Sequence, residues 1–128
     1  MIRRLFFIIL LAIGVASCGV NKGGMTPTAQ TDLTLKPSTD EVEHVEQNLV
    51  VPKGARELSK YDRYYATEII DNERYIRGKF VIAKSVSRIF IVDIGQLPAT
   101  FDGGCGVLLL RYSVVRKEFD IIRCSGIG

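Results

Sequence analysis

Three cysteines carry the clearest chemical potential in this chain of 128 residues. Cys18 follows an apolar run near the N-terminus, whereas Cys105 and Cys124 lie near the other end. A thiol can form a thioether, a disulfide or a metal thiolate, depending on its neighbours and its compartment. Because an exported protein with an odd number of cysteines keeps one of them outside its disulfides, the pattern predicts a separate role for one cysteine.

The residues before Cys18 have the pattern of an export signal. Arg3 and Arg4 form a positive end, and the apolar run 5–15 (LFFIILLAIGV) is far shorter than the roughly 20 residues that span a bilayer. Small residues close the run directly before the cysteine. This end of the signal resembles the lipobox of bacterial lipoproteins, and the residues that carry the likeness are Val15, Ala16, Ser17 and Cys18.

The resemblance implies a processing route and a location. Residues 1–17 would be a signal peptide, and Cys18 would carry a diacylglycerol thioether and a further acyl chain such as palmitate. Several chains anchor firmly, because each buried CH₂ contributes about 0.8 kcal/mol. In the sorting rule of some Gram-negative lipoproteins, Asp after the lipidated cysteine retains the protein in the inner membrane; Gly19 stands there, which implies the outer membrane, facing the periplasm. The alternative is an ordinary secretory peptide with a coincidental cysteine.

The remaining two cysteines predict a disulfide, because an oxidising compartment favours their pairing. A tight turn at Arg116 and Lys117 would place Cys124 opposite Leu109, roughly 13 Å along the strand from Cys105. A bridge needs Cα atoms within about 7 Å, so the chain would have to curl. The residues that permit a curl are Gly103, Gly104 and Gly106. Free thiols or a redox-active pair remain the alternatives.

The distribution of catalytic residue types argues against an enzyme. The chain has one histidine, His44, with no cysteine or second histidine nearby, so we expect it on a solvated surface and predict no metal site. A nucleophile activated by histidine needs that residue within the fold. Glycoside cleavage needs two facing carboxylates, and no spacing here selects such a pair. We therefore expect no catalytic residues and no cofactor.

Composition divides the mature chain in two. Residues 18–51 are rich in small and polar residues without a sustained apolar period, and they predict a lipid-anchored flexible tether. Val42 and Val45 are three apart and allow a turn or two of helix, which is marginal alone. Residues 19–52 carry a net charge of minus three and residues 53–128 a net charge of plus four, a balance typical of ordinary solubility.

Residues 52–128 predict a mainly β (α+β) domain. Ala55, Leu58, Tyr61 and Tyr65 have the spacing of one short amphipathic helix. Alternating apolar residues then predict an antiparallel sheet of about five strands, at 64–70, 74–83, 88–94, 107–115 and 118–124.

Residue types at the strand ends and along the strands give the details of this sheet. Asp71 and Asn72 accept positive φ and predict a two-residue hairpin. In the second strand Ile76 and Phe80 share one face, with Arg77 and Lys79 on the other, as in a sheet that is wet on one side. The turn at Arg116 and Lys117 would pair Tyr112 with Ile121.

Two stretches are candidates for binding. In the first, aromatic residues interleave with cations, which suits sugar faces and protein hot spots alike. Its members are Tyr61, Arg63, Tyr64, Tyr65, Arg74, Tyr75, Arg77 and Lys79. The alternative is that half of these tyrosines pack in the core. The second stretch is the long connection 95–106, which contains Asp102; a single carboxylate is too little for a calcium site, and a glycine-rich bend that seats the disulfide is the alternative.

Two classes of function follow. In the first, the chain is a lipid-anchored lipoprotein of the cell envelope that presents a small domain to an envelope protein or glycan; the candidate surface is Tyr61, Arg63, Tyr64, Tyr75, Arg77 and Asp102. Nucleic acid is not an expected partner outside the cytoplasm. In the second, it is a structural component whose exposed sheet edges pair with another chain.

Overall fold

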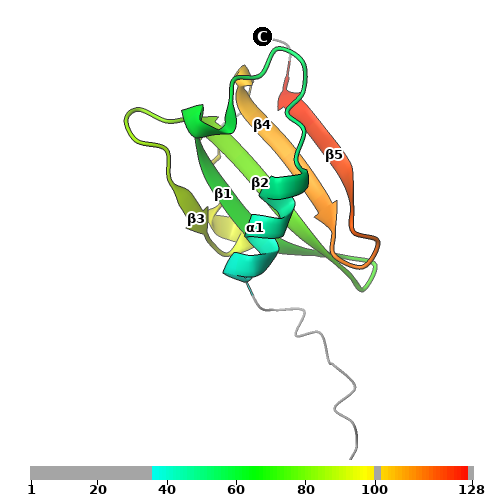
Figure 1. The fold of residues 1–128 in the computed structure, drawn as a ribbon. Helices are drawn as coiled ribbons and strands as arrows, with labels where there is room; N and C mark the ends of the chain where they lie inside the picture. The colour runs from blue at the N-terminus through cyan, green and yellow to red at the C-terminus, as the bar shows by residue number, and fades with distance from the viewer. Residues whose placement is uncertain (1–35, 100–101, 127–128) are drawn as a thin grey trace, which may run out of the picture.

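The computed structural model describes residues 36–99 and 102–126. It contains one sheet, one α-helix and two short 3₁₀ helices (Figure 1). The elements are α1 (Thr39–Asn48), η1 (Leu58–Lys60), β1 (Tyr61–Ile70), β2 (Glu73–Ile82), β3 (Ile89–Ile91), η2 (Ile94–Gln96), β4 (Gly104–Ser113) and β5 (Glu118–Ser125). The predicted mainly β fold with five strands is confirmed. The predicted signal peptide, Cys18 and residues 19–35 lie outside the described residues.

The five strands form a mixed sheet in the order β3-β1-β2-β4-β5. Three neighbouring pairs are antiparallel, but β3 runs parallel to β1, so the prediction of a purely antiparallel sheet was wrong in this detail. The cause lies in where β2 ends. Ile82 pairs with Tyr61, so the chain leaves β2 beside the start of β1, passes round that end and then runs along the free edge of β1 in the same direction.

The two hairpins differ in how well the sequence predicts them. Asp71 and Asn72 have φ values of 50° and 62°, which confirms the predicted two-residue turn between β1 and β2. The turn between β4 and β5 is longer than predicted, since four residues separate Ser113 from Glu118, and Lys117 has a positive φ whereas Arg116 does not.

The longer turn changes the register of the second hairpin. A shift next to Arg111 places Tyr112 opposite Phe119 rather than Ile121, so the predicted pairing was wrong. As a result, Ile122 packs against the core, whereas Ile121 lies on the other face of the sheet.

The helix lies in a different place from the predicted one. The stretch from Ala55 to Tyr65 forms only the single turn of η1, and β1 begins at Tyr61. Helix α1 instead occupies part of the predicted tether and lies across one face of the sheet (Figure 1). Val42 and Val45 of α1 are buried in the core, so the folded domain begins well before the boundary predicted at residue 52.

A capping box starts α1 at Ser38. The backbone N–H of Glu41 donates to the Ser38 hydroxyl at 3.2 Å, and the Ser38 N–H donates to the Glu41 carboxylate at 2.8 Å. Such reciprocal bonds satisfy two N–H groups that have no partner within the helix. They give a short, polar helix a defined first turn.

The core lies between α1 and the sheet and contains large aromatic side chains. Tyr65 and Phe80 are fully buried and meet edge to face at 5.4 Å between ring centroids. Gly78 makes room beside them, because a Cβ there would lie 2.4 Å from Cγ of Leu110. The prediction that Ile76 and Phe80 face the core is confirmed.

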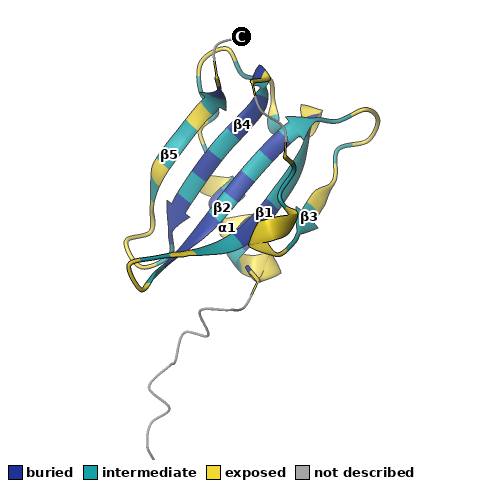
Figure 2. Ribbon diagram, turned by 180° about the vertical axis from the view of Figure 1, so that it is seen from behind, coloured by how far each residue is buried: buried dark blue, intermediate teal, exposed yellow. Residues whose placement is uncertain are grey.

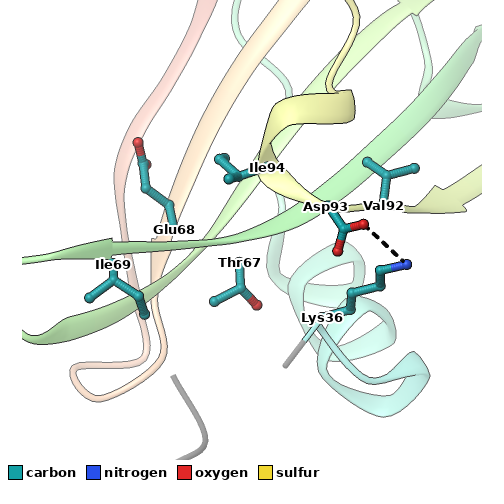
Figure 3. A pocket seen from close by; sticks show the side chains of 7 residues that line it. All are labelled: Lys36, Thr67, Glu68, Ile69, Val92, Asp93 and Ile94. Atoms are coloured by element: carbon teal, nitrogen blue, oxygen red, sulfur yellow. Dashed lines mark ion pairs between the residues drawn. The ribbon is translucent and has the colours of Figure 1, made fainter. Parts of the chain in front are cut away.

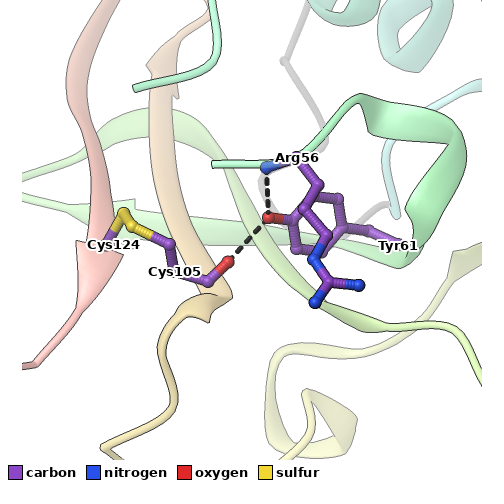
Figure 4. The surroundings of a disulfide bond; sticks show 4 residues. All are labelled: Arg56, Tyr61, Cys105 and Cys124. Atoms are coloured by element: carbon purple, nitrogen blue, oxygen red, sulfur yellow. Dashed lines mark hydrogen bonds between the residues drawn. A yellow bond between two sulfur atoms is a disulfide. The ribbon is translucent and has the colours of Figure 1, made fainter. Parts of the chain in front are cut away.

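The predicted disulfide between Cys105 and Cys124 is formed, with 4.5 Å between the Cα atoms (Figure 4). Gly104 pairs with Ser125 and the next ladder pair is Leu108 with Cys124, so three residues of β4 are extra at this point. This curl confirms the predicted role of the glycines: Gly104 has φ 53°, and the N–H of Gly106 donates to the carbonyl of Gly103. Cys124 therefore lies opposite Leu108, not opposite Leu109 as predicted.

Tyr61 ties the disulfide region to the chain before β1. Its hydroxyl donates to the carbonyl of Cys105 at 2.6 Å and accepts the backbone N–H of Arg56 at 3.0 Å (Figure 4). Tyr61 is fully buried, so these bonds satisfy a hydroxyl that has no access to water.

Candidate functional site

The predicted aromatic and cationic surface is divided between the two faces of the sheet. Side chains alternate along β1, so Tyr61, Arg63 and Tyr65 lie on the face covered by α1, whereas Tyr64 lies on the opposite face. We call that opposite face the open face; Tyr75 and Arg77 of β2 belong to it. The six predicted residues therefore do not form one patch.

The members on the α1 face are structural. Tyr61 and Tyr65 are fully buried, as the core alternative predicted for about half of the tyrosines. Arg63 forms an ion pair with Glu46 of α1 at 2.9 Å, and the Tyr65 hydroxyl donates to the same carboxylate at 2.9 Å. Burial and the charge of Glu46 raise the pKa of Tyr65 far above its usual range, so this hydroxyl remains a donor.

The aromatic rings of the open face are engaged by neighbours. Tyr64 stacks on Phe90 of β3, with 4.6 Å between the ring centroids and 13° between the ring planes. The guanidinium of Arg111 lies over the ring of Tyr75 at 5.2 Å, and Tyr75 is only 7% exposed. The ring faces used for these contacts are not free to stack on a sugar.

Cations surround Leu109 at the centre of the open face. Leu109 of β4 pairs with Lys79 of β2 on one side and with Arg123 of β5 on the other. Arg77 and Arg111 face each other across β2 and β4, two residues further along each strand. Figure 2 views the sheet from this side and shows β4 and β5 without α1 in front of them.

Acidic residues offset part of this positive charge. Glu68 pairs with Arg77 at 3.0 Å, and Asp120 lies 3.6 Å from Nε of Arg111. Burial and the charge of Arg77 lower the pKa of Lys79 from its usual value. The direction of this shift means that the surroundings of Lys79 disfavour its positive charge.

A pocket of about 260 Å³ opens on this face between the sheet and the segment around η2. Arg77, Lys79 and Leu109 line it on the side of the sheet, and Ile94 and Leu97 line it on the other side. These walls therefore combine aliphatic side chains with two cations. Glu68 and Ser125 complete the lining.

A larger pocket, of about 410 Å³, lies at the edge of the sheet (Figure 3). Thr67 and Ile69 of β1 line it, and Lys36 reaches across to Asp93 in an ion pair of 3.6 Å. The ladder between β1 and β3 ends at Tyr65, whose carbonyl accepts the N–H of Val92. The pocket follows directly on that end of the ladder.

His44 lies in α1, not in a tether as predicted. Its Nε2 lies 3.1 Å from the hydroxyl of Tyr112, and both side chains line a third pocket of about 260 Å³ between α1 and the end of β4. No group of three metal-ligating side chains occurs within residues 36–99 and 102–126. His44 contacts Tyr112 and so joins the helix to the sheet.

Asp102 stands apart from the open-face cluster. It has φ 56° and is exposed just before β4, and a Cβ added at Gly126 would lie 2.9 Å from its carboxylate oxygen. Asp102 therefore lies where the residues just before β4 closely approach the residue just after β5.

The sequence analysis missed the members of the open face that lie on β4 and β5. Leu109, Arg111 and Arg123 join Arg77 and Lys79 only through the pairing of the strands. Leu109 and Arg111 are two residues apart in the predicted strand, which was a usable sign that they share a face. The position of Arg123, in contrast, depended on the register.

The described residues contain no helix that is long and apolar enough to cross a membrane. Comparison with known proteins reveals no similarity: no family model, no curated protein and no solved structure matches the chain.

Proposed function

We propose that this chain is a lipid-anchored lipoprotein of the bacterial cell envelope, which presents a small binding domain to an envelope protein or glycan. The observation that carries the proposal is Cys18. It is the one cysteine outside the disulfide, and it follows Val15, Ala16 and Ser17 in the order that resembles a lipobox. Gly19 after this cysteine favours the outer membrane.

The distance between the anchor and the domain fits this arrangement. Residues 19–35 separate Cys18 from the first described residue, and an extended chain of that length reaches at most about 60 Å. A domain held on such a segment stays close to the membrane. The open face, with its cations and its pocket, is the surface we assign to binding.

The intact mass of the full chain extracted from cell membranes tests the anchor. We expect a protein that begins at Cys18 and carries a diacylglycerol and one more acyl chain, with a mass that reductant leaves unchanged apart from opening the disulfide. The variant Cys18→Ser should lose the lipid and leave the membrane fraction. A wild-type protein that retains residues 1–17, or that begins at Cys18 without lipid, would contradict the proposal.

The edge of β1 supports assembly with another chain as the second candidate function. The ladder to β3 covers only Arg63–Tyr65, and the pocket beyond it offers apolar surface at Ile69, which is 39% exposed. An added strand would continue the position of β3.

A proline at the β1 edge tests this second function. The backbone groups of Arg63 and Tyr65 point toward β3, and by alternation the N–H of Ile69 points to the same side, away from β2. Ile69→Pro should therefore abolish cross-linked oligomers in the native envelope and leave the β1–β2 pairing intact. Oligomers that persist in a folded Ile69→Pro variant argue against edge pairing.

A further inference from the structure

The edge of β1 that faces β3 is covered along only part of its length. β3 pairs with Arg63–Tyr65, and the N–H of Val92 then donates to the carbonyl of Tyr65. Beyond that point the chain turns into η2, and within the part of the chain that the structure describes no strand pairs with Ile69 on the side away from β2. Ile69 is 39% exposed, and the pocket of about 410 Å³ beside it is the space that a further strand would fill.

The opposite edge of the sheet, at β5, is protected against pairing. The register shift beside Arg111 leaves Asp120 as a bulge. Arg116 forms ion pairs with Glu118 and with Asp120 along this strand. Bulges and charged side chains discourage the pairing of an edge strand, whereas an uncovered apolar edge promotes aggregation. The edge of β1 is therefore the one that needs a cover.

The described chain begins at the pocket beside this edge. Lys36 lines the pocket and pairs with Asp93, and it lies on the side of β1 to which Ile69 points (Figure 3). Pro37 is buried, which fixes the position of the chain just before α1. The residue before a proline favours an extended backbone, so Lys36 leads back into residues 31–35 in a strand-like conformation. Five extended residues cover about 17 Å, which is enough to follow the second half of β1.

The sequence of residues 31–35 (TDLTL) alternates as a strand does. In an added strand Leu33 and Leu35 would share one face. Opposite Ile69 these leucines bury apolar surface, whereas opposite Glu68 they would lie beside the ion pair that Glu68 forms with an arginine of β2. The side-chain chemistry therefore selects the register with Leu33 opposite Ile69.

We propose that residues 31–35 of this chain add to the second half of β1 as a sixth, antiparallel strand, with Leu33 opposite Ile69. The direction follows from Lys36, because the chain enters beside the end of β3 and runs back from there along β1. The inference goes beyond the proposed lipoprotein function and does not depend on the lipid. A strand of another chain would reach this edge only after the segment has left it.

Pairs of introduced cysteines test the register in the full chain as cells process it. Leu33→Cys with Ile69→Cys should form a disulfide within one chain, because opposite residues of paired strands have Cα atoms about 5.5 Å apart. Asp32→Cys with Ile69→Cys is the matched control, since these two side chains would point to opposite faces. We expect the first pair to bridge at least about fivefold more than the control, measured by mass spectrometry of unreduced peptides.

Hydrogen exchange of the full chain in detergent micelles tests for the strand without added cysteines. By alternation the N–H of Ile69 points away from β2, and the added strand gives it an acceptor. Leu33→Asp should therefore raise the exchange rate of this amide at least about tenfold. Met25→Asp makes the same kind of change outside the segment and should alter the rate by less than about twofold.

Three results would overturn this proposal. They are equal or reversed bridging of the two cysteine pairs, unchanged exchange at Ile69 in Leu33→Asp, and bridging of the first pair between chains rather than within one chain. The third result would assign the edge to a second copy, as the assembly function requires. The lipid anchor is judged by intact mass, so a failure of the added strand is distinguishable from a failure of the anchoring.

Discussion

Replacing Cys105 and Cys124 together by serine is expected to lower the free energy of unfolding by about 3 kcal/mol at 25 °C. The bridge joins residues that are 19 apart in sequence, and its loss restores the conformational freedom of that loop in the unfolded chain. For a domain of this size the melting temperature should fall by roughly 12 to 24 °C. Urea unfolding followed by circular dichroism measures the change.

Two controls separate the bridge from other effects of the cysteines. Wild-type protein that has been reduced and alkylated at both sulfurs should show a similar loss. Cys18→Ser, which leaves the disulfide intact, should unfold at the same urea concentration as the wild type. A loss below about 1 kcal/mol in the double variant would mean that the curl of β4 and the bonds of Tyr61 hold this region without the bridge.

Glu41→Gln is expected to destabilise the domain by about 2 kcal/mol, because it leaves the charge of Arg74 without its partner. Arg74 is only 7% exposed, and both of its terminal nitrogens bond to the Glu41 carboxylate. The side chain of Glu41 is 30% exposed, so we expect less than the roughly 3 to 5 kcal/mol lost when a fully buried pair is broken. Glutamine keeps the capping bond to Ser38, so the variant tests the charge rather than the cap.

The effect of this variant should depend on pH. The hydrogen bond from Arg74 is the main reason that the pKa of Glu41 lies below its ordinary value of 4.5. A carboxylate with a lowered pKa in the folded state adds stability above the unfolded pKa, and this stability is lost as the pH falls through the folded pKa. The difference in unfolding free energy between wild type and Glu41→Gln should therefore be largest at pH 7 and should decrease below about pH 4.5.

A neighbouring carboxylate provides the matched control for this ion pair. Glu43 lies on the exposed side of α1, where its contact is a long hydrogen bond from Gln47. Glu43→Gln should change stability by less than about 0.5 kcal/mol at either pH. An equal effect of the two variants would attribute the loss to the charge of α1 as a whole rather than to Arg74.

Much of the sheet could be predicted because its signals are local. Alternating β-branched and aromatic residues mark each strand, and Asp71 and Asn72 mark the first hairpin through their tolerance of positive φ. The error at Ala55–Tyr65 has a geometric cause: Tyr61 and Tyr65 lie on one side of a helix but also on one side of a strand. Four residues are close to one helical turn and are also two strand repeats.

The helix α1 was harder to predict because its stabilisation is tertiary. It is short and mostly polar, and only Val42 and Val45 are buried. Its stability comes from contacts with the sheet, among them the ion pairs of Glu41 with Arg74 and of Glu46 with Arg63. The spacing of Ser38 and Glu41 was the one local sign of its start.

The open face depends on register, which the sequence leaves open. The predicted two-residue turn at Arg116 and Lys117 displaces β5 by two residues next to the turn and by one residue from Arg111 onward. A slip of one residue moves the side chains of that part of the strand to the other face. The shift beside Arg111 and the curl after Gly104 both depend on backbone geometry that residue types do not specify. Consequently, the position of Arg123 beside Leu109 could not be obtained from the sequence alone.

The position of α1 at the start of the folded domain determines how tension would pass through the molecule. If Cys18 is fixed to a membrane and a partner pulls on the open face, the strain within the described residues first meets the ion pair of Lys36 with Asp93 and then reaches the first turn of α1. The bonds of Glu41 to Ser38 and Arg74 carry the load next. Helix α1 would therefore detach from the sheet before any strand separates. The disulfide and the long ladders of β2 and β4 follow α1 in the chain and would bear the tension only after the helix has detached.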